Sequence, residues 1–181
     1  GVNRENTRYT SEGGWYECDK VRFRQGTPEK IGGWQRISAS TFLGVCRSIW
    51  NWVTLTSQNL VGLGTNLKFY IENGGGYNDI TPLRKAAATL GNNPFVAVSG
   101  SATVTVTDAT GGYIEGDFVT FSGGSSVGGL DLNAEFQIAS LVSTTSYTIV
   151  ASSNASSSAT GGGSSVTAAY QINVGPAFVI P

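Results

Sequence analysis

Apolar and polar residues alternate over short stretches throughout the chain. Near the start, Val21 and Phe23 alternate with Arg22 and Arg24, which predicts a strand whose apolar pair faces a core while the basic pair faces outward. Turn-forming residues follow at 25–28, and the apolar pattern resumes at 29–31. The pattern therefore predicts a β-hairpin, preceded by an extended arm.

Three more short strands are predicted at 45–55, 60–63 and 67–71. A Gly-Thr-Asn turn at 64–66 joins the last two, and three glycines at 74–76 close the unit. Consecutive antiparallel strands rich in tryptophan and glycine are typical of a propeller blade or an open β-meander. Because a single blade cannot bury both of its faces, further blades are expected to come from elsewhere.

The second part of the chain shows a more regular alternation between residues 102 and 172. Val104 and Val106 alternate with threonines, and similar patterns recur at 118–121, 136–138, 147–150 and 166–172. Five or six short strands separated by glycine and serine turns predict a small β-barrel or sandwich. Residues 86–93 are interpreted as a linker, and the stretch 151–165, which has few large apolar side chains, as a long mobile hairpin tip.

Charge is distributed unevenly along the chain. Residues 1–85 contain all 11 basic residues and 7 acidic ones, whereas residues 86–181 contain 5 acidic residues and no basic one. This shift indicates two units with different surroundings and a boundary near residue 86. The chain lacks methionine and ends on an apolar run, so a piece of a longer polypeptide is expected.

The residue types disfavour most enzymatic chemistry. There is no histidine, which removes the commonest general base and the commonest zinc ligand. Ser126 lies in a Gly-x-Ser-x-Gly pattern, but without a histidine or a strand-to-helix turn. Glu115 and Asp117 could share one strand face and serve a calcium ion or a glycan-cleaving site, although solvated turn residues explain them better. We therefore expect a non-enzymatic protein with no catalytic residue, cofactor or metal.

The two cysteines and the hydropathy pattern add little. Cys18 and Cys46 could form one disulfide, but two free thiols are the favoured interpretation. No stretch approaches the roughly 20 apolar residues that span a bilayer, and no signal-peptide pattern is visible. No membrane insertion is expected.

Two groups of residues are candidates for binding. Arg22, Arg24, Lys30 and Arg36 lie among aromatic residues, and such a basic surface could contact acidic faces of neighbouring subunits or phosphates of DNA passing through a channel. Alternatively, it is an ordinary polar face of a sheet. Trp50 and Trp52 share a strand face and, with Tyr147, could stack on sugar rings; packing between blades is the competing interpretation.

Several ordered motifs in the first part resemble a known family. Four segments are similar to the N-terminal part of tail or virion structural proteins of tailed phages. They are Val21-Arg22-Phe23-Arg24-Gln25-Gly26-Thr27-Pro28-Glu29-Lys30-Ile31-Gly32-Gly33-Trp34, residues 50–55, Gly64-Thr65-Asn66-Leu67-Lys68-Phe69-Tyr70 and Asp79-Ile80-Thr81-Pro82. This resemblance covers about residues 1–84 and implies a propeller-like fold.

The second part resembles a different module. The segments 116–123, 132–138 and 146–149 are similar to small β-barrels of phage tail proteins and of the first catalytic-cysteine half-domain of ubiquitin-activating enzymes, without implying ubiquitin chemistry. Residues 170–175 look like a return to the first module. The expected organisation is therefore an all-β chain: a partial propeller-like antiparallel scaffold at 1–90, an inserted small β-barrel at 91–173, and a return to the scaffold at 174–181.

The resemblance implies a structural role in a phage tail or head-to-tail assembly, as a hub, nozzle or adaptor. Expected partners are other virion proteins in a homo-oligomeric ring, with possible passage of DNA through its channel; the location would be the virion tail, and the host cytoplasm during assembly. The alternative is a glycan-binding module that attaches a phage or bacterial surface protein to a host glycan.

Overall fold

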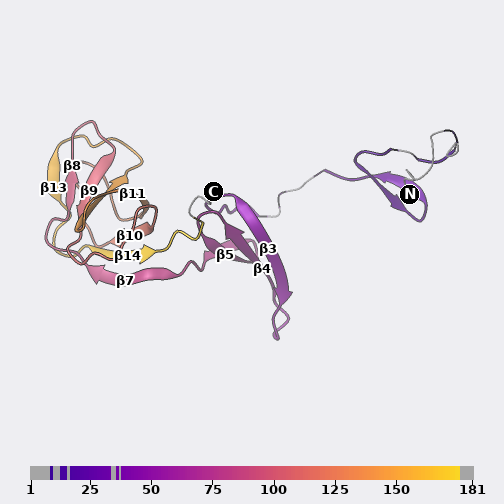
Figure 1. The fold of residues 1–181 in the computed structure, drawn as a ribbon, viewed down its shortest axis with the longest axis horizontal. Coiled ribbons are helices and arrows are strands. Elements are labelled where there is room, and N and C mark those ends of the chain that lie inside the picture. The colour runs from indigo at the N-terminus through magenta and orange to yellow at the C-terminus, as the bar shows by residue number, and fades with distance from the viewer. Residues whose placement is uncertain (1–8, 10–12, 16, 34–35, 37, 176–181) are drawn as a thin grey trace, which may run out of the picture. The chain divides into compact units, whose positions relative to one another are not determined.

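The computed structural model describes residues 9, 13–15, 17–33, 36 and 38–175. Two compact units are distinguished by their internal contacts, Gly1–Ala39 and Ser40–Pro181. All of the regular elements in the described residues are β-strands, and every paired strand is antiparallel (Figure 1). The predicted all-β class is confirmed.

The first unit contains the predicted hairpin. Strands β1 (Val21–Arg24) and β2 (Thr27–Lys30) pair with Arg24 opposite Thr27, so the loop is the dipeptide Gln25-Gly26. Both loop residues have positive φ, 49° and 83°. A two-residue hairpin loop with two positive φ values matches the right-handed twist of the strands, and glycine tolerates this backbone conformation best.

The first sheet of the second unit is a four-stranded meander. Its strands pair in chain order: β3 (Cys46–Val53), β4 (Asn59–Thr65), β5 (Phe69–Asn73) and β6 (Gly76–Asp79). This is the arrangement of one propeller blade. Strands β3, β4 and β5 lie where three strands were predicted, whereas β6 was not predicted and the predicted turn residues Gly64 and Thr65 belong to β4. The meander is the one four-stranded sheet in the described part of the chain, and completion of a propeller by further blades stays a prediction.

The other sheet of the second unit has eight strands in the order β13-β8-β9-β12-β11-β10-β14-β7. Their bounds are β7 (Leu83–Thr89), β8 (Phe95–Ala97), β9 (Thr103–Thr107), β10 (Phe118–Ser122), β11 (Glu135–Ser143), β12 (Ser146–Val150), β13 (Ala159–Gly161) and β14 (Thr167–Gln171).

The expected barrel is not closed, since the end strands β13 and β7 are not paired with each other. After β13 the chain turns through Gly162 and Gly163, both with positive φ. The segment that follows β7 does not pair with β13. Leu90 N donates to Val166 O, which extends the β7–β14 ladder beyond the pair Thr89↔Thr167, and Asn93 N donates to Gly163 O just after β13. Closure would need a continuous ladder between β7 and β13.

The eight-stranded sheet surrounds one aromatic and aliphatic core. Val104 and Val106 of β9 are completely buried, whereas Thr103 and Thr107 are exposed, so the alternation read from the sequence sets which face is buried. The buried cluster consists of Leu90, Phe95, Ala97, Val104, Val106, Tyr113, Val119, Phe121, Val127, Leu130, Leu132, Ile138, Tyr147, Ile149, Ala155, Val166, Ala168 and Tyr170.

Two segments differ from the sequence prediction. The expected linker at 86–93 contains the second half of β7, which pairs with β14. The expected mobile tip at 151–165 contains β13 and the buried Ala155, whose backbone N–H donates to Ser101 O at 2.9 Å. Small side chains allow this segment to lie close to its neighbours: a Cβ on Gly128 would lie 2.5 Å from Ser157 O. The predicted domain boundaries at 90 and 173 stay predictions.

Candidate functional site

One face of the four-stranded sheet is lined by aromatic and aliphatic side chains. In the register, Trp50 on β3 lies opposite Gly62 on β4, which lies opposite Ile71 on β5. Because side chains two residues apart share a face, Trp52 and Phe69 project to this same side. The face therefore presents two indoles, a phenyl ring and an isoleucine together.

Glycines make this face hollow. A Cβ on Gly62 would lie 3.1 Å from the Trp52 ring, and one on Gly64 would lie 2.5 Å from Ser48 Oγ and 3.5 Å from the Phe69 ring. Any side chain at these two positions would fill the space between the rings. The result is a groove of about 200 Å³, here called the aromatic groove, lined by Ser48, Trp50, Trp52, Gly62, Leu63, Gly64, Phe69, Tyr70, Ile71 and Ile80.

The aromatic groove is open to solvent and almost entirely apolar. Trp50 is 75% exposed and Ile80 50% exposed, although large apolar side chains are normally buried. Among its lining side chains, polar atoms come from Ser48, from the indole N–H groups and from Tyr70, whose hydroxyl already accepts a hydrogen bond from Leu43 N at 3.2 Å. Such contiguous exposed apolar surface typically marks a contact with another molecule.

The structure brings two of the three predicted glycan-stacking residues together. Trp50 and Trp52 both line the aromatic groove. Tyr147, in contrast, is completely buried in the core of the eight-stranded sheet, and its hydroxyl lies 2.9 Å from that of Tyr170. The Tyr147 ring offers no open face to a sugar, because β12 turns it inward along with Ile149. The stacking role assigned to Tyr147 is thereby corrected.

Three of the four predicted basic contact residues lie on the first hairpin, on both of its faces. Arg22 and Arg24 share one face, and Arg22 forms a 3.1 Å ion pair with Glu29 on the opposing strand. Lys30 lies opposite Val21 and therefore on the other face. Arg36 donates from Nη2 to Ala39 O at 2.7 Å. Contact of these residues with other subunits stays a prediction.

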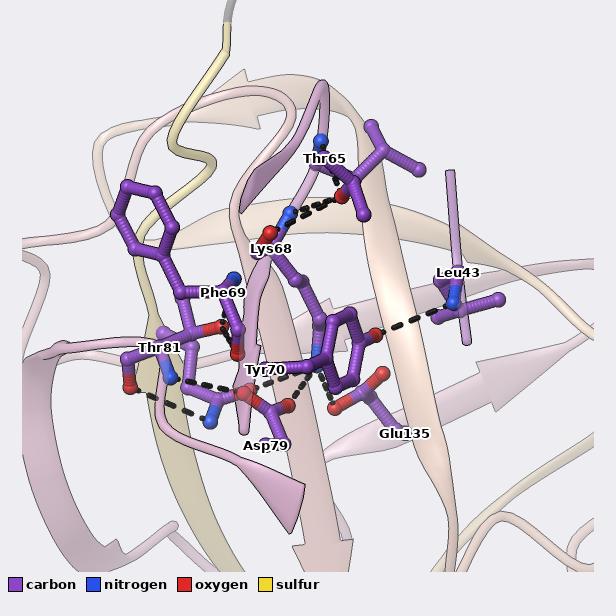
Figure 2. A network of polar contacts seen from close by, with 10 residues as sticks. Leu43, Thr65, Lys68, Phe69, Tyr70, Asp79, Thr81 and Glu135 are labelled. Carbon is purple, nitrogen blue, oxygen red and sulfur yellow. Dashed lines mark hydrogen bonds and ion pairs between the residues drawn. The ribbon is translucent and has the colours of Figure 1, made fainter. Parts of the chain in front are cut away.

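Sequence reasoning missed a buried ion-pair cluster that joins the two sheets of the second unit. Figure 2 shows Lys68, just before β5, with its ammonium group directed at Asp79 of β6 and at Glu135 of β11. The distance from Lys68 Nζ to Asp79 Oδ2 is 2.7 Å, and to Gln171 Oε1 of β14 it is 2.8 Å. The Lys68 side chain is 1% exposed, so all of its charge is satisfied by protein groups.

Two further basic residues pair with acidic residues that flank strands of the eight-stranded sheet, Asp117 just before β10 and Asp108 just after β9. Arg84 donates from both Nε and Nη2 to the completely buried Asp117. Lys85 Nζ lies 3.1 Å from Asp108 Oδ2, and Asp108 also accepts a 2.7 Å hydrogen bond from Tyr170. Three basic residues before position 86, Lys68, Arg84 and Lys85, therefore pair with three of the five acidic residues after it.

These contacts shift the pKa values of the groups involved. Burial opposes the charged form of Lys68, but its bonds to Asp79 and Glu135 outweigh burial and raise its pKa. Burial also opposes the charged form of Asp79, and the bonds from Lys68 and Thr81 outweigh it and lower its pKa. For Asp108, burial is outweighed by bonds from Thr110, Tyr170 and Lys85, so its pKa is lowered too.

We expect the second unit to lose stability in acid. A carboxyl group whose folded pKa is lowered contributes stability that is fully present above its ordinary pKa of 3.8 and is lost as the pH falls through the lower folded value. Urea midpoints measured from pH 6 down to pH 2 should therefore decrease below about pH 4. Asp79→Asn should flatten this decrease, and an unchanged midpoint in the parent protein would contradict the expectation.

Other predicted chemistry finds little support in the described residues. Asp117 is occupied by Arg84, so Glu115 and Asp117 do not form an open carboxylate pair. No group of three or more His, Cys, Asp or Glu side chains in the described ranges could hold a metal ion. Cys18 and Cys46 are both free thiols. Among the described residues, no helix has the length and apolar character needed to cross a membrane.

Comparison with known proteins gives limited similarity. A solved structure of a phage phi92 endosialidase matches 71% of this chain with a TM-score of 0.42 and 17% identity, and the match covers 17% of that protein. No family model and no curated protein matches the chain. The expected similarity to the half-domain of ubiquitin-activating enzymes is not shown. This likeness establishes neither a family nor a function.

Proposed function

We propose that the chain is a structural component of a bacteriophage tail or head-to-tail assembly, as a hub, nozzle or adaptor. Its mechanism would be mechanical: the aromatic groove and the exposed part of β3 bind neighbouring virion subunits. Support comes from the ordered motifs between residues 21 and 82 that resemble virion proteins of tailed phages, and from the all-β fold. The location would be the virion tail, with copies arranged in a ring.

The observation that carries this proposal is the exposed apolar face of the four-stranded sheet. Burying an isoleucine or phenylalanine side chain stabilises a contact by about 1.5–3 kcal/mol, and Trp50, Phe69 and Ile80 of the aromatic groove are exposed by 75%, 40% and 50%. A neighbouring protein surface can cover them all at once. The core of an interface between subunits is an apolar surface of this kind, buried by the neighbouring protein.

Glycan binding at the aromatic groove is the competing function. Stacking of sugars on Trp50 and Trp52 would need polar groups beside the rings to bind the sugar hydroxyls. Two side chains that line the groove carry a hydroxyl group, Ser48 and Tyr70. The Tyr70 hydroxyl is already bonded to Leu43 N, which leaves Ser48 as the hydroxyl available to a sugar. A protein partner with an apolar surface therefore fits the groove better than a glycan.

Hydroxyl-radical footprinting tests the proposal on intact particles of the phage that encodes this chain. We expect mass spectrometry to find the chain in purified particles, and oxidation of Trp50 to be several-fold slower there than in the isolated protein. Val142, which is 59% exposed on β11, reports general loss of reagent access. Absence from the particles would contradict the virion role. Equal oxidation of Trp50 in both samples would contradict the subunit contact and favour glycan binding.

A further inference from the structure

Strand β3 forms a free edge of the four-stranded sheet. It stands first in the strand order β3-β4-β5-β6 and pairs with β4 alone among the described strands. Every residue of β3 except Trp52 is exposed. Natural proteins usually protect such an edge with charged residues or proline, but residues 48–55 contain neither. An uncovered edge of this kind is suited to pairing with another strand.

The hydrogen-bond register identifies the backbone groups that face outward. Thr54 N donates to Gln58 O, and in an antiparallel ladder the bonded pairs recur at every second residue. The pairs Trp52↔Leu60 and Trp50↔Gly62 therefore use their backbone groups to bind β4. The N–H and C=O groups of Ile49, Asn51 and Val53 point away from the sheet, toward the free edge.

The sequence of β3 is symmetric in its chemistry about Asn51. Reading outward in both directions gives Trp50 and Trp52, then Ile49 and Val53, and then Ser48 and Thr54. Two antiparallel copies with Asn51 opposite Asn51 would match each residue with one of the same type. Trp50 would lie opposite Trp52 on one face, and Ile49 opposite Val53 on the other.

We propose that two copies of this chain pair through β3, antiparallel, about a two-fold axis at Asn51. The pairing joins two four-stranded sheets into one continuous sheet of eight strands. It satisfies the outward backbone groups and adds two Trp–Trp and two Ile–Val cross-strand pairs, which are the contacts that stabilise paired strands. A two-fold axis requires such a self-complementary surface. Pairing does not depend on the virion role, because it is a property of the isolated chain.

The charges along β3 also favour a second copy of this chain as the strand that pairs with it. Arg47 is the one charged residue of β3, and in this register it lies opposite Leu55 of the other copy, so no like charges meet. The backbone geometry also sets a distance: Asn51 forms a hydrogen-bonded pair with its symmetry mate, for which the two Cα atoms are about 5.5 Å apart. That separation lies within the range of a disulfide.

Disulfide trapping tests both the pairing and its register. In a background with Cys18→Ser and Cys46→Ser, Asn51→Cys should form a covalent dimer within minutes under mild oxidation. Ile49→Cys is the matched control: its symmetry mate would lie about 13 Å away along the strand, so it should remain mostly monomeric. No trapping at position 51, or equal trapping at position 49, would overturn the proposed register.

Sedimentation velocity of the purified 181-residue chain tests the association itself. We expect a dimer whose fraction rises with concentration in the parent protein, and a more than tenfold weaker association in Asn51→Pro. Proline is tolerated here because the Asn51 N–H points outward. Val53→Lys should also weaken pairing, whereas Val142→Lys, at a similarly exposed valine of β11, should not. A parent protein that stays monomeric, or a dimer unaffected by Asn51→Pro, would overturn the proposal.

Discussion

Replacing Lys68 with methionine should lower the free energy of unfolding of the second unit by about 3–5 kcal/mol. Methionine has a similar length, so the packing over the Phe118 ring, now 4.6 Å from Lys68 Nζ, is largely kept. The ammonium group is lost, however, and Asp79 and Glu135 remain close together without a counter-charge. Removing one partner of a buried ion pair is costly because the other charges stay partly desolvated.

Urea unfolding followed by tyrosine and tryptophan fluorescence measures this change. Lys20→Met is the control, because among the described residues Lys20 forms an ion pair with Asp19 alone and both side chains are 85% exposed; its effect should stay within about 0.5 kcal/mol. Adding Glu135→Gln to Lys68→Met should recover part of the loss by removing one unpaired carboxylate. A loss below about 1 kcal/mol in Lys68→Met would show that the cluster adds little to stability.

The Phe95→Ala variant should also lose about 3–5 kcal/mol of stability. Phe95 is 1% exposed and packs edge-to-face on Phe121, with ring centroids 5.0 Å apart. Its ring also fills the space beside Gly162, where a Cβ would lie 2.7 Å from it. Truncation leaves a cavity between β8 and β10 that these neighbours can close only in part.

Val96→Ala provides the control for Phe95→Ala on the same strand. Val96 is 39% exposed on the opposite face of β8, so its truncation should cost less than about 1 kcal/mol. Thermal unfolding by circular dichroism gives the comparison, with near-ultraviolet spectra to confirm native packing at low temperature. Similar losses for the two variants would mean that β8 is not part of the cooperative core.

Local patterns were sufficient to predict most strands and the sides that they bury. Alternation placed Val104 and Val106 in the core, and the spacing of Trp50 and Trp52 placed both on one face. The turn signal at 25–28 located the first hairpin, although its last two residues belong to β2. These features depend on the two-residue period of a strand and on the φ values that a tight turn requires. Neither depends on the partner strand.

The segments that were misread lack that local signal. Residues 86–89, Ala-Ala-Ala-Thr, have little strand propensity, but they form the second half of β7 because β14 provides a ladder for them. The stretch 151–165 has few large side chains, yet it is held by backbone bonds to Ser101 and Gly128. In both places the stabilising groups come from strands or turns that are distant in the sequence.

Some features of the fold and of the candidate site follow from the sequence alone, and others only from the tertiary structure. By itself, the sequence determined the all-β class, the short antiparallel strands and the pairing of two tryptophans on one face. The tertiary structure alone decided that Tyr147 is buried, that Lys68 binds Asp79 and Glu135, and that the eight-stranded sheet stays open. A strand's period fixes which residues share a face, but whether that face meets solvent, a core or an opposite charge depends on chain packing against it.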